Sequence, residues 1–334
     1  MTSIHQGILL KAAALTAVAG LAMTGCSAAE SAGSEGKEKI GIALPAGNQT
    51  FWTSWQNGAR DAAAKLGVEA TFSDAKGDAN TQNDQVNSLL VGGAKGIIIA
   101  SVDPKANASV AQAAADSEAI LITGNRTIEA AYGGLDGANP RVHVGFNDVA
   151  IGKMQGELVV EACKGIDPCQ VVLQEGTLGA TPQIQRTEGL MAGIKSAPNV
   201  KIIDKQSNDF DPTKAVEVTQ TLLQKHAKID IMLAQTDPEA VAAARVVAEQ
   251  GRQDAIKVIG IGGSMDGTAA VESGALYGTV WVSAKADASA AVETLVKIMR
   301  KESVDVATIA DRPTVEVAAV KVTKANVAQY PGEW

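Results

Sequence analysis

Two kinds of segment alternate along the chain from Lys39 onwards: short apolar runs rich in β-branched residues, and longer amphipathic runs. Most of the short runs are continuously apolar, which is what a parallel strand covered on both faces requires. The alternation therefore predicts an α/β fold with right-handed crossovers. The strands are expected at 40–44, 68–72, 96–101, 119–124, 141–146, 170–174, 200–205, 230–235, 257–262 and 277–282.

Helices are expected at 51–66, 80–91, 105–117, 149–163, 183–196, 213–226, 239–250, 265–273 and 285–301. Three of them begin near an Asp-Pro pair, and Asp103, Asp211 and Asp237 are each predicted to be the N-cap residue. Because ten strands are many for one open sheet, we expect two doubly wound parallel-sheet lobes. Ligands bind at the carboxyl ends of the strands in such sheets, so the residues that follow each strand are the functional candidates.

The first residues of the chain have the pattern of a secretory signal. Lys11 precedes an apolar run at 12–22 that ends in Met23-Thr24-Gly25-Cys26, and this end resembles the cleavage box of bacterial lipoproteins, with Met23 in place of the usual Leu. A plain signal peptide is the alternative. A membrane span is not expected, because it needs about 20 apolar residues and the run at 12–22 is shorter. Residues 1–25 are therefore predicted to be a signal peptide, Cys26 the lipid attachment site and 26–37 a flexible tether.

Charge and cysteine usage fit an exported protein. The formal net charge of −8 becomes −9 once residues 1–25 and their single basic group, Lys11, are removed, so a nucleic-acid partner is not expected. Cys163 and Cys169 flank a Gly-Ile-Asp-Pro turn, which in an oxidising compartment predicts a short-loop disulfide. No His lies near this pair, and neither a metal nor a cofactor is expected.

Motifs for nucleotide binding or catalysis do not emerge from the sequence. The segment 260–263 lacks the G-x-G-x-x-G spacing, and neither a phosphate-binding loop nor a G-x-S-x-G elbow occurs. The acidic segment 74–80 lacks the Glu that closes a calcium loop and is interpreted as a solvated turn. The sequence therefore shows no constellation of residues that predicts catalysis.

The few aromatic residues, 3% of the chain, gather where strands are expected to end. Phe51 and Trp52 follow the first strand, Phe210 follows the strand at 200–205, and Trp281 lies at the end of the last long strand. Flat apolar rings stack on the C–H faces of sugars and polyols, so these positions predict a carbohydrate-like ligand. Trp55, one helical turn further along, is favoured as a core residue.

A set of ordered segments resembles the type I periplasmic binding proteins of the ribose-binding kind. The segments are 42–44, 51–52, 58–59, 65–67, 96–99, 122–126, 185–189, 209–211, 234–237, 258–261 and 273–276. The resemblance implies two lobes, joined by a three-strand hinge, that close on a ligand. It assigns 38–146 plus 283–305 to the N-terminal lobe and 147–282 plus 306–334 to the C-terminal lobe. Repressors that share this fold carry a DNA-binding segment where this chain has an export signal.

The resemblance also implies the ligand-binding positions: Asn48, Gln49, Phe51, Trp52, Asn125, Arg126, Arg186, Phe210, Thr236, Asp237, Gly262 and Trp281. This chain departs from the family at Thr236, where an Asn is usual, and at Gly262, where an Asp is usual. Val282 stands at or beside the usual Gln. Because several hydroxyl-binding groups are missing, ribose itself is not expected.

The implied function is that of a substrate-binding lipoprotein of an ABC transporter, which captures a monosaccharide or polyol and delivers it to the permease subunits. It would act as a monomer anchored to the outer face of the bacterial cytoplasmic membrane. An anionic sugar acid, bound by Arg126 and Arg186, is the alternative ligand, unless a carboxylate such as Glu175 neutralises the pocket. A receptor for a sugar-like signal and a secreted enzyme on the same fold are the alternatives in other classes.

Overall fold

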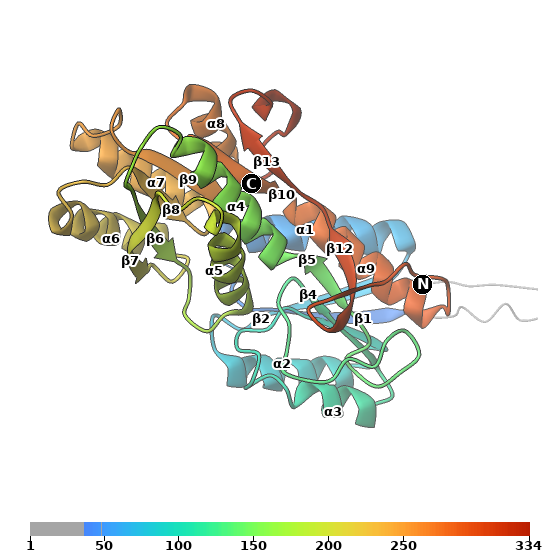
Figure 1. The fold of residues 1–334 in the computed structure, drawn as a ribbon. Coiled ribbons are helices and arrows are strands. Elements are labelled where there is room, and N and C mark those ends of the chain that lie inside the picture. Colours follow the sequence, from blue (N-terminus) through green and yellow to red (C-terminus); the bar gives the residue numbers. More distant parts are fainter. Residues whose placement is uncertain (1–36, 48) are drawn as a thin grey trace, which may run out of the picture. The chain divides into compact units, whose positions relative to one another are not determined.

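The computed structural model describes residues 37–47 and 49–334 (Figure 1). The predicted signal peptide, Cys26 and nearly all of the tether lie outside these residues, and so does Asn48. The described residues form two β-sheets, and helices cover both faces of each sheet. This is the predicted α/β architecture of two doubly wound lobes. None of the described helices combines the length and the apolarity that crossing a bilayer would take.

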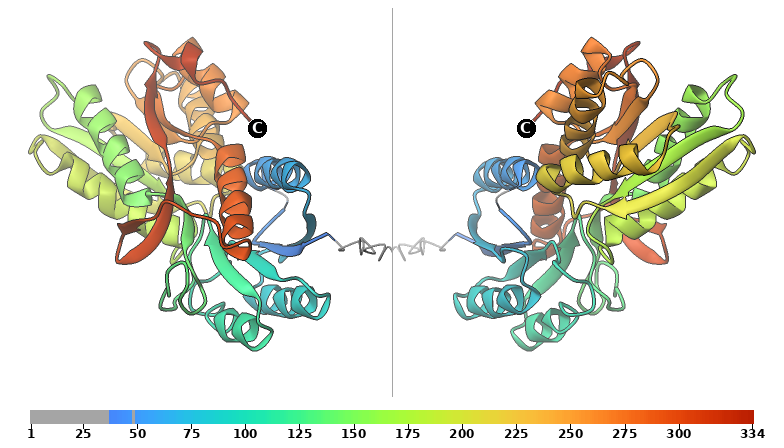
Figure 2. Two further views of the ribbon diagram at one scale, coloured as in Figure 1. Left: turned by 90° about the vertical axis from the view of Figure 1, so that its right-hand side faces the viewer. Right: turned by 90° about the vertical axis from the view of Figure 1, so that its left-hand side faces the viewer.

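The first sheet has seven strands in the order β11-β12-β5-β4-β3-β1-β2. Their bounds are β1 Lys39–Leu44, β2 Glu69–Asp74, β3 Gly96–Ile99, β4 Ile120–Gly124, β5 His143–Phe146, β11 Ala307–Ile309 and β12 Arg312–Val317. Helices α1 (Thr50–Leu66) and α9 (Ala284–Met299) cover one face, and α2 (Ala79–Val91) and α3 (Val110–Asp116) cover the other. Figure 2 shows α9 beside α1, although the two helices come from opposite ends of the described chain.

The second sheet has six strands in the order β13-β10-β9-β8-β6-β7. Their bounds are β6 Cys169–Glu175, β7 Val200–Ser207, β8 Ile231–Ala234, β9 Lys257–Ile261, β10 Gly278–Val282 and β13 Ala319–Thr323. Helices α4 (Asp148–Ala162) and α5 (Thr181–Ile194) cover one face. The other face carries α6 (Pro212–Lys225), α7 (Asp237–Glu249) and α8 (Met265–Ser273), and a short 3₁₀ turn follows at Val327–Gln329.

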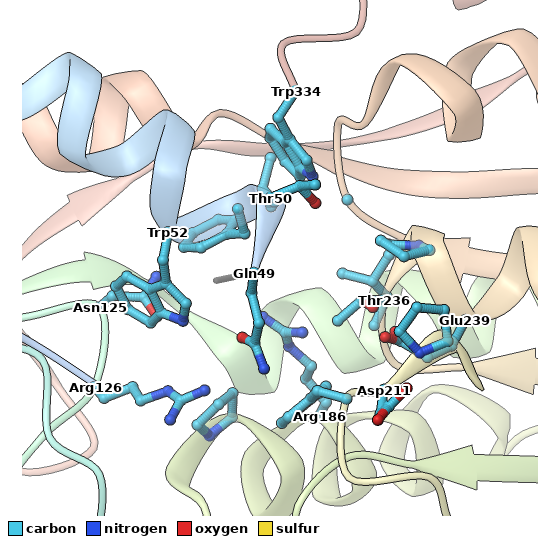
Figure 3. A pocket seen from close by; sticks show the side chains of 18 residues that line it. Gln49, Thr50, Trp52, Asn125, Arg126, Arg186, Asp211, Thr236, Glu239 and Trp334 are labelled. Atoms are coloured by element: carbon cyan, nitrogen blue, oxygen red, sulfur yellow. The ribbon is translucent and has the colours of Figure 1, made fainter. Parts of the chain in front are cut away.

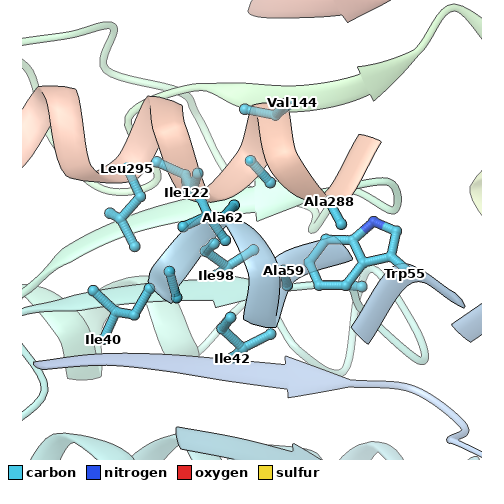
Figure 4. Packing of buried hydrophobic residues seen from close by; sticks show 14 of the residues in the cluster. Ile40, Ile42, Trp55, Ala59, Ala62, Ile98, Ile122, Val144, Ala288 and Leu295 are labelled. Carbon is cyan, nitrogen blue, oxygen red and sulfur yellow. The ribbon is translucent and has the colours of Figure 1, made fainter. Parts of the chain in front are cut away.

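The core of the first lobe is built from aliphatic strand residues and small helical ones (Figure 4). Ile40, Ile42 and Ile98 of the sheet face Ala59 and Ala62 of α1, whose short side chains let the helix lie close to the strands. Each fully buried Ile contributes roughly 1.5–3 kcal/mol. Packed branched residues therefore contribute much of the stability of this lobe, together with the buried rings of Trp52 and Trp55.

Helices α4 and α5 approach each other so closely that glycines are required at their contact. A Cβ on Gly152 would lie 2.0 Å from the carbonyl oxygen of Arg186, and one on Gly189 would lie 2.0 Å from that of Val149. Any side chain there would force the helices apart. The close contact holds α5, which carries Arg186, against the body of the second lobe.

The chain crosses between the lobes three times: from β5 to α4, from β10 to α9, and from β12 to β13. The third crossing differs from the predicted boundary, which assigned 306–334 to the C-terminal lobe. β12 pairs in parallel with β5, and β11 pairs antiparallel with β12, so 307–317 lie in the first sheet. The boundary was misplaced because these strands are half-exposed and lack the apolar run that marks a central strand.

Two of the predicted helix caps are wrong. α3 begins at Val110 rather than near 105, and Asp103 instead accepts a hydrogen bond from the Ala106 amide, which closes a preceding turn. Asp237 lies inside α7, where Thr236 is the N-cap. The cap at Asp211 is confirmed, since its carboxylate accepts from the amides of Thr213 and Lys214.

The predicted disulfide between Cys163 and Cys169 is present. It ties the end of α4 to the start of β6, next to the buried face of the second sheet. The described part of the chain contains no cluster of three His, Cys, Asp or Glu side chains arranged for a metal ion.

Candidate functional site: a cavity at the strand ends

A cavity of about 360 Å³ lies where the strands of both sheets end (Figure 3). Its volume falls in the lower part of the range of about 300–1,000 Å³ that is usual for small-molecule sites. Both lobes contribute to it, and the lining consists of Gln49, Thr50, Phe51, Trp52, Asn125, Arg126, Pro182, Arg186, Phe210, Asp211, Pro212, Thr236, Pro238, Glu239, Ile261, Gly262, Val282 and Trp334. Only a molecule of small size fits between the lobes as they stand.

Nine of the predicted ligand-binding residues line this cavity: Gln49, Phe51, Trp52, Asn125, Arg126, Arg186, Phe210, Thr236 and Gly262. Asn48 is outside the described residues. Asp237 and Trp281 do not belong to the lining. The positions that follow strands thus converge, as the fold class predicted.

Asp237 is directed into the second lobe instead of the cavity. It is fully buried, and one of its carboxylate oxygens accepts a hydrogen bond of 2.6 Å from the Thr279 hydroxyl on β10. Burial raises the pKa of Asp237 to about 6. Because Asp237 lies one residue inside α7 rather than at its N-cap, its side chain points into the second lobe and not into the cavity.

Trp281 lies on the outer side of β10. Its ring packs 5.6 Å from that of Tyr330, and its indole N–H donates to the Pro331 carbonyl oxygen at 3.2 Å. Side chains alternate along a strand, so the neighbouring Val282 faces the cavity in its place. Trp281 therefore lies outside the cavity lining, one strand position away from Val282.

Aromatic rings form an apolar wall on the first-lobe side of the cavity. The ring of Phe51 meets that of Trp52 edge to face at 5.1 Å and that of Trp334 edge to face at 5.4 Å. The three rings present apolar surfaces in fixed orientations. Such a wall is suited to the C–H faces of a carbohydrate or polyol.

The second lobe contributes Phe210 in a constrained conformation. Its φ is 56°, in the left-handed region that bulky residues rarely adopt, and its amide donates to Asn208 Oδ1 at 3.1 Å. A Cβ on Gly176 would lie 2.0 Å from this ring, so glycine is needed there to make room for it. Strain of this kind persists only where the surrounding structure holds the residue in place, and strained residues are frequent at binding sites.

Arg126 supplies the cavity with a cation that has no carboxylate partner among the described residues. Its guanidinium carbon lies 5.3 Å from the centre of the Trp52 ring, and its Nε is buried with no hydrogen-bond acceptor in the described structure. Burial, followed by the charge of Arg186, lowers the pKa of Arg126 to about 10, so the group stays protonated at neutral pH. It is a donor available to a ligand.

Arg186, in contrast, is neutralised within the second lobe. It is buried, its Nε donates to Asp148 Oδ1 at 2.8 Å, and its Nη1 donates to the Gln235 carbonyl oxygen at 2.7 Å. The ion pair holds the guanidinium against α4 and fixes the side of the cavity that it lines. The alternative sugar-acid hypothesis needed two unneutralised arginines, and Arg186 does not meet this condition.

Asn125 is oriented by a buried carboxylate beneath the cavity. Its Nδ2 donates to Asp287 Oδ2 at 2.8 Å, and the Trp55 indole N–H donates to the same oxygen at 3.0 Å. Burial raises the pKa of Asp287 to about 7. Because the amide nitrogen is occupied, Oδ1 of Asn125 remains available to accept a hydrogen bond from a ligand.

Two carboxylates of the lining were not predicted from the sequence. Asp211 caps α6, and Glu239 lies in the first turn of α7 with its Oε2 buried and unpartnered among the described residues. Burial raises the pKa of Glu239 to about 8, so the group is mainly uncharged at neutral pH. The signal was present in the sequence, since both residues belong to the Asp-Pro motifs that mark helix starts after strands.

Glu175, which the sequence offered as a candidate to neutralise the pocket, does not belong to the cavity lining. It accepts from Gln183 Nε2 at 3.1 Å and from the Thr187 hydroxyl at 2.9 Å, within the second lobe. The lining also includes Pro182, Pro212 and Pro238, each in the first turn of a helix. These rings give the second-lobe rim a rigid apolar edge.

Two parallel-sheet lobes with a small-molecule cavity between the carboxyl ends of their strands define the type I fold of ligand-binding proteins. The chain belongs to the periplasmic binding protein domain family, whose model matches residues 40–303.

Curated relatives cover most of the chain. The ribose import binding protein of Haemophilus influenzae is 27% identical over 291 residues, which are 87% of this chain and 95% of that protein. The xylitol-binding protein of Mycolicibacterium smegmatis is 26% identical over 294 residues, which are 88% of this chain and 81% of that protein.

Solved structures agree in fold. An ABC transporter solute-binding protein from Mycobacterium smegmatis, with bound glycerol, is 29% identical with a TM-score of 0.80 and covers 90% of this chain and 98% of its own. One from Bacillus halodurans, with bound myo-inositol, is 25% identical with a TM-score of 0.79 and covers 90% of this chain and 100% of its own.

Proposed function

We propose that this chain is the substrate-binding component of an ABC transporter and that it captures a small neutral carbohydrate or polyol between its lobes. The observation that carries the proposal is the cavity itself, where the rings of Phe51, Trp52 and Phe210 lie beside polar groups from both lobes. The relatives named above, which bind ribose, xylitol, glycerol and myo-inositol, support the same ligand class.

The charges in the cavity favour a neutral ligand over an acid. The positive charge of Arg186 is balanced by Asp148, and Asp211 adds a negative charge opposite Arg126. Glu239 is mainly protonated at neutral pH and would repel an anion once ionised. The lining therefore offers hydrogen-bond donors and acceptors with little net charge, which suits hydroxyl groups.

A sugar acid is the second candidate, and Arg126 is the observation that favours it. Its unpaired guanidinium could pair with a carboxylate, with which arginine forms directed bidentate hydrogen bonds. The same group can equally donate two hydrogen bonds to neighbouring hydroxyls of a neutral ligand. The two candidates therefore differ in whether Arg126 must meet a negative charge.

The remaining features of the proposal concern the place and the partners of the protein. It would be exported, anchored by a lipid on Cys26 to the outer face of the bacterial cytoplasmic membrane, and would pass its ligand as a monomer to the permease subunits without altering it. The signal-like sequence at 1–26 supports this proposal. Cys26→Ala should release the protein from the membrane fraction, and retention there would contradict the anchor.

The ligand class is tested by a thermal-shift screen followed by calorimetry. The panel contains glycerol, D-ribose, xylitol, myo-inositol and D-allose as neutral compounds, and D-gluconate and D-xylonate as acids. We expect neutral compounds to raise the melting temperature and the acids to leave it unchanged. Stabilisation by acids alone would replace the neutral-ligand proposal with the second candidate, and no stabilisation by any compound would overturn the proposed ligand class.

Two arginine variants make a matched comparison in this screen. Arg126 lies over the Trp52 ring inside the cavity, and Arg60 lies over the Phe72 ring outside it, at 4.3 Å from the centroid. Hydrogen bonds from charged groups contribute about 1.5–3 kcal/mol, so Arg126→Gln should weaken binding by at least tenfold. Arg60→Gln should leave the affinity within twofold of the wild-type value.

A further inference from the structure

The segment 330–334 reaches the cavity, although it does not directly follow any of the strands whose ends surround the cavity. It follows the 3₁₀ turn at Val327–Gln329 and runs along the second lobe, where the Trp281 indole donates to the Pro331 carbonyl oxygen. The Glu333 amide then donates to the Gly263 carbonyl oxygen at 2.7 Å, and the Met265 amide donates to the Trp334 carbonyl oxygen at 2.7 Å. Three hydrogen bonds thus fix the path of this segment on the second lobe.

The segment lies so close to α8 that it requires a glycine. A Cβ on Gly332 would lie 2.4 Å from the Met265 Cα and 2.7 Å from its amide nitrogen. The hydrogen bonds of the two residues that follow depend on this approach. Gly332 therefore positions Glu333 and Trp334.

Glu333 extends the segment onto the first lobe. Its Oε1 accepts a hydrogen bond of 2.5 Å from the Ser283 hydroxyl, and its Oε2 accepts from the Lys285 amide at 3.3 Å. Ser283 is the N-cap of α9, which packs against α1 and the first sheet. A carboxylate at a helix N-terminus is favoured by the helix dipole. One residue thus connects the β9–α8 loop of the second lobe to a first-lobe helix.

Trp334 also connects the two lobes, and it does so from inside the cavity. Its ring contacts hydrophobic residues of both lobes and stands edge to face against Phe51. It lies beside Thr50, on the far side of the cavity from Arg126 and Arg186 (Figure 3). Its Nε1 is buried and has no acceptor among the described residues. A buried N–H without an acceptor is costly, and a ligand hydroxyl in the cavity would supply one.

We propose that residues 331–334 form a strap that ties the two lobes together and that Trp334 is a ligand-contacting wall of the cavity, with its indole N–H donating to a ligand hydroxyl. The inference rests on the proposed function for its ligand, but the strap itself does not depend on the ligand's identity. Because Trp334 contacts both lobes, an opening of the lobes would break its contact with either Phe51 or Met265.

The ligand contact is tested by calorimetry with xylitol, myo-inositol and D-ribose on the full chain. Trp334→Phe keeps an aromatic ring against Phe51 and loses the donor, so its affinity should fall about tenfold for whichever of these compounds binds, which corresponds to about 1.4 kcal/mol. Trp334→Ala should lose more. Tyr330→Phe is the matched control, since Tyr330 belongs to the same segment but faces Trp281 outside the cavity, and its affinity should stay within twofold.

The strap is tested without ligand by hydrogen exchange of backbone amides. In Trp334→Ala and Glu333→Gln, the amides of Met265 and Lys285 should exchange at least tenfold faster, while the Thr81 amide, capped by Asp78 in the first lobe, should not change. Unchanged affinity in both Trp334 variants would overturn the ligand contact, and unchanged exchange at both amides would overturn the strap. If none of the three compounds binds the wild-type chain, the ligand-contact half falls with the proposed function, and the exchange result alone decides the strap.

Discussion

Glu239→Gln removes an ionisable group from the cavity lining and keeps the shape of the side chain. Glu239 is 2% exposed, and burial is the main cause that raises its pKa to about 8; a backbone hydrogen bond and the charge of Arg186 lower the pKa, and the charge of Asp237 raises it. The protonated carboxyl can donate a hydrogen bond to a ligand hydroxyl, whereas the ionised one cannot. Gln has the same shape and keeps a donor at every pH.

The size of the effect follows from the pKa. If a neutral ligand binds only the protonated form, affinity falls tenfold for each pH unit above about 8, so wild-type binding at pH 9 should be roughly tenfold weaker than at pH 7, or about 1.4 kcal/mol. Glu239→Gln should bind at pH 7 within a few-fold of wild type and should lose little between pH 7 and pH 9. Calorimetry in matched buffers, with a neutral compound that binds in the screen, measures both curves.

The same carboxyl affects stability, with a sign that follows from proton binding. Between the ordinary value of 4.5 and about 8, the folded state keeps a proton that the unfolded state has released, so stability falls as the pH rises through this window. The loss is at most about 5 kcal/mol. The urea midpoint of Glu239→Gln should therefore increase relative to wild type from pH 5 to pH 9. A flat wild-type affinity curve, or an equal fall in both proteins, would refute the role given to Glu239.

Three further predictions concern the frame around the cavity. Replacing Cys163 and Cys169 by Ser opens a short loop and should cost about 2 kcal/mol, seen as a lower melting temperature that reduction of the wild type reproduces; equal melting of oxidised and reduced wild type would contradict it. Arg186→Met leaves the buried Asp148 unpaired and should lower the free energy of unfolding, measured in urea, by about 3–5 kcal/mol. Adding Asp148→Asn should restore part of this stability, and no restoration would show that the unpaired carboxylate is not the cause of the loss. Gly189→Ala places a Cβ against α4 and should lower the free energy of unfolding by about 1–3 kcal/mol. The control Glu188→Ala, at an exposed neighbouring position, should change it by no more than about 0.5 kcal/mol, and similar urea midpoints for the two variants would refute the close contact.

The central strands could be predicted because burial on both faces leaves a pattern that needs no knowledge of the neighbours. β3, Gly96–Ile99, is buried at every position, and its apolar run is visible in the sequence alone. β11, β12 and β13 were not predicted, because their residues are mostly half-exposed and their identity as strands comes from pairing with β5 and β10. Such strands are defined by tertiary contacts rather than by their own composition.

The site was predictable where a residue directly follows a strand. Phe51, Trp52 and Phe210 were predicted because they come soon after strands, whereas Gln49, Asn125 and Arg186 came from the resemblance to the family. Trp334 was missed because nothing in the local sequence brings residues 330–334 to the cavity; hydrogen bonds to residues far away in the chain, such as Gly263 and Met265, do so. Asp237 and Trp281 were misplaced because a shift of one residue on a helix or strand turns a side chain to a different face.

The crossing from β12 to β13 has a consequence for how the chain acquires its structure. β12 completes the first sheet beside β5, and β13 closes the second sheet beside β10, yet both come from a stretch of only 12 residues at 312–323. A fragment that stops at 303, where the family match ends, would lack strands of both lobes at once. The two sheets therefore receive their last strands within a few residues of each other on a growing chain, and any attempt to produce one lobe alone must join segments that are far apart in the sequence.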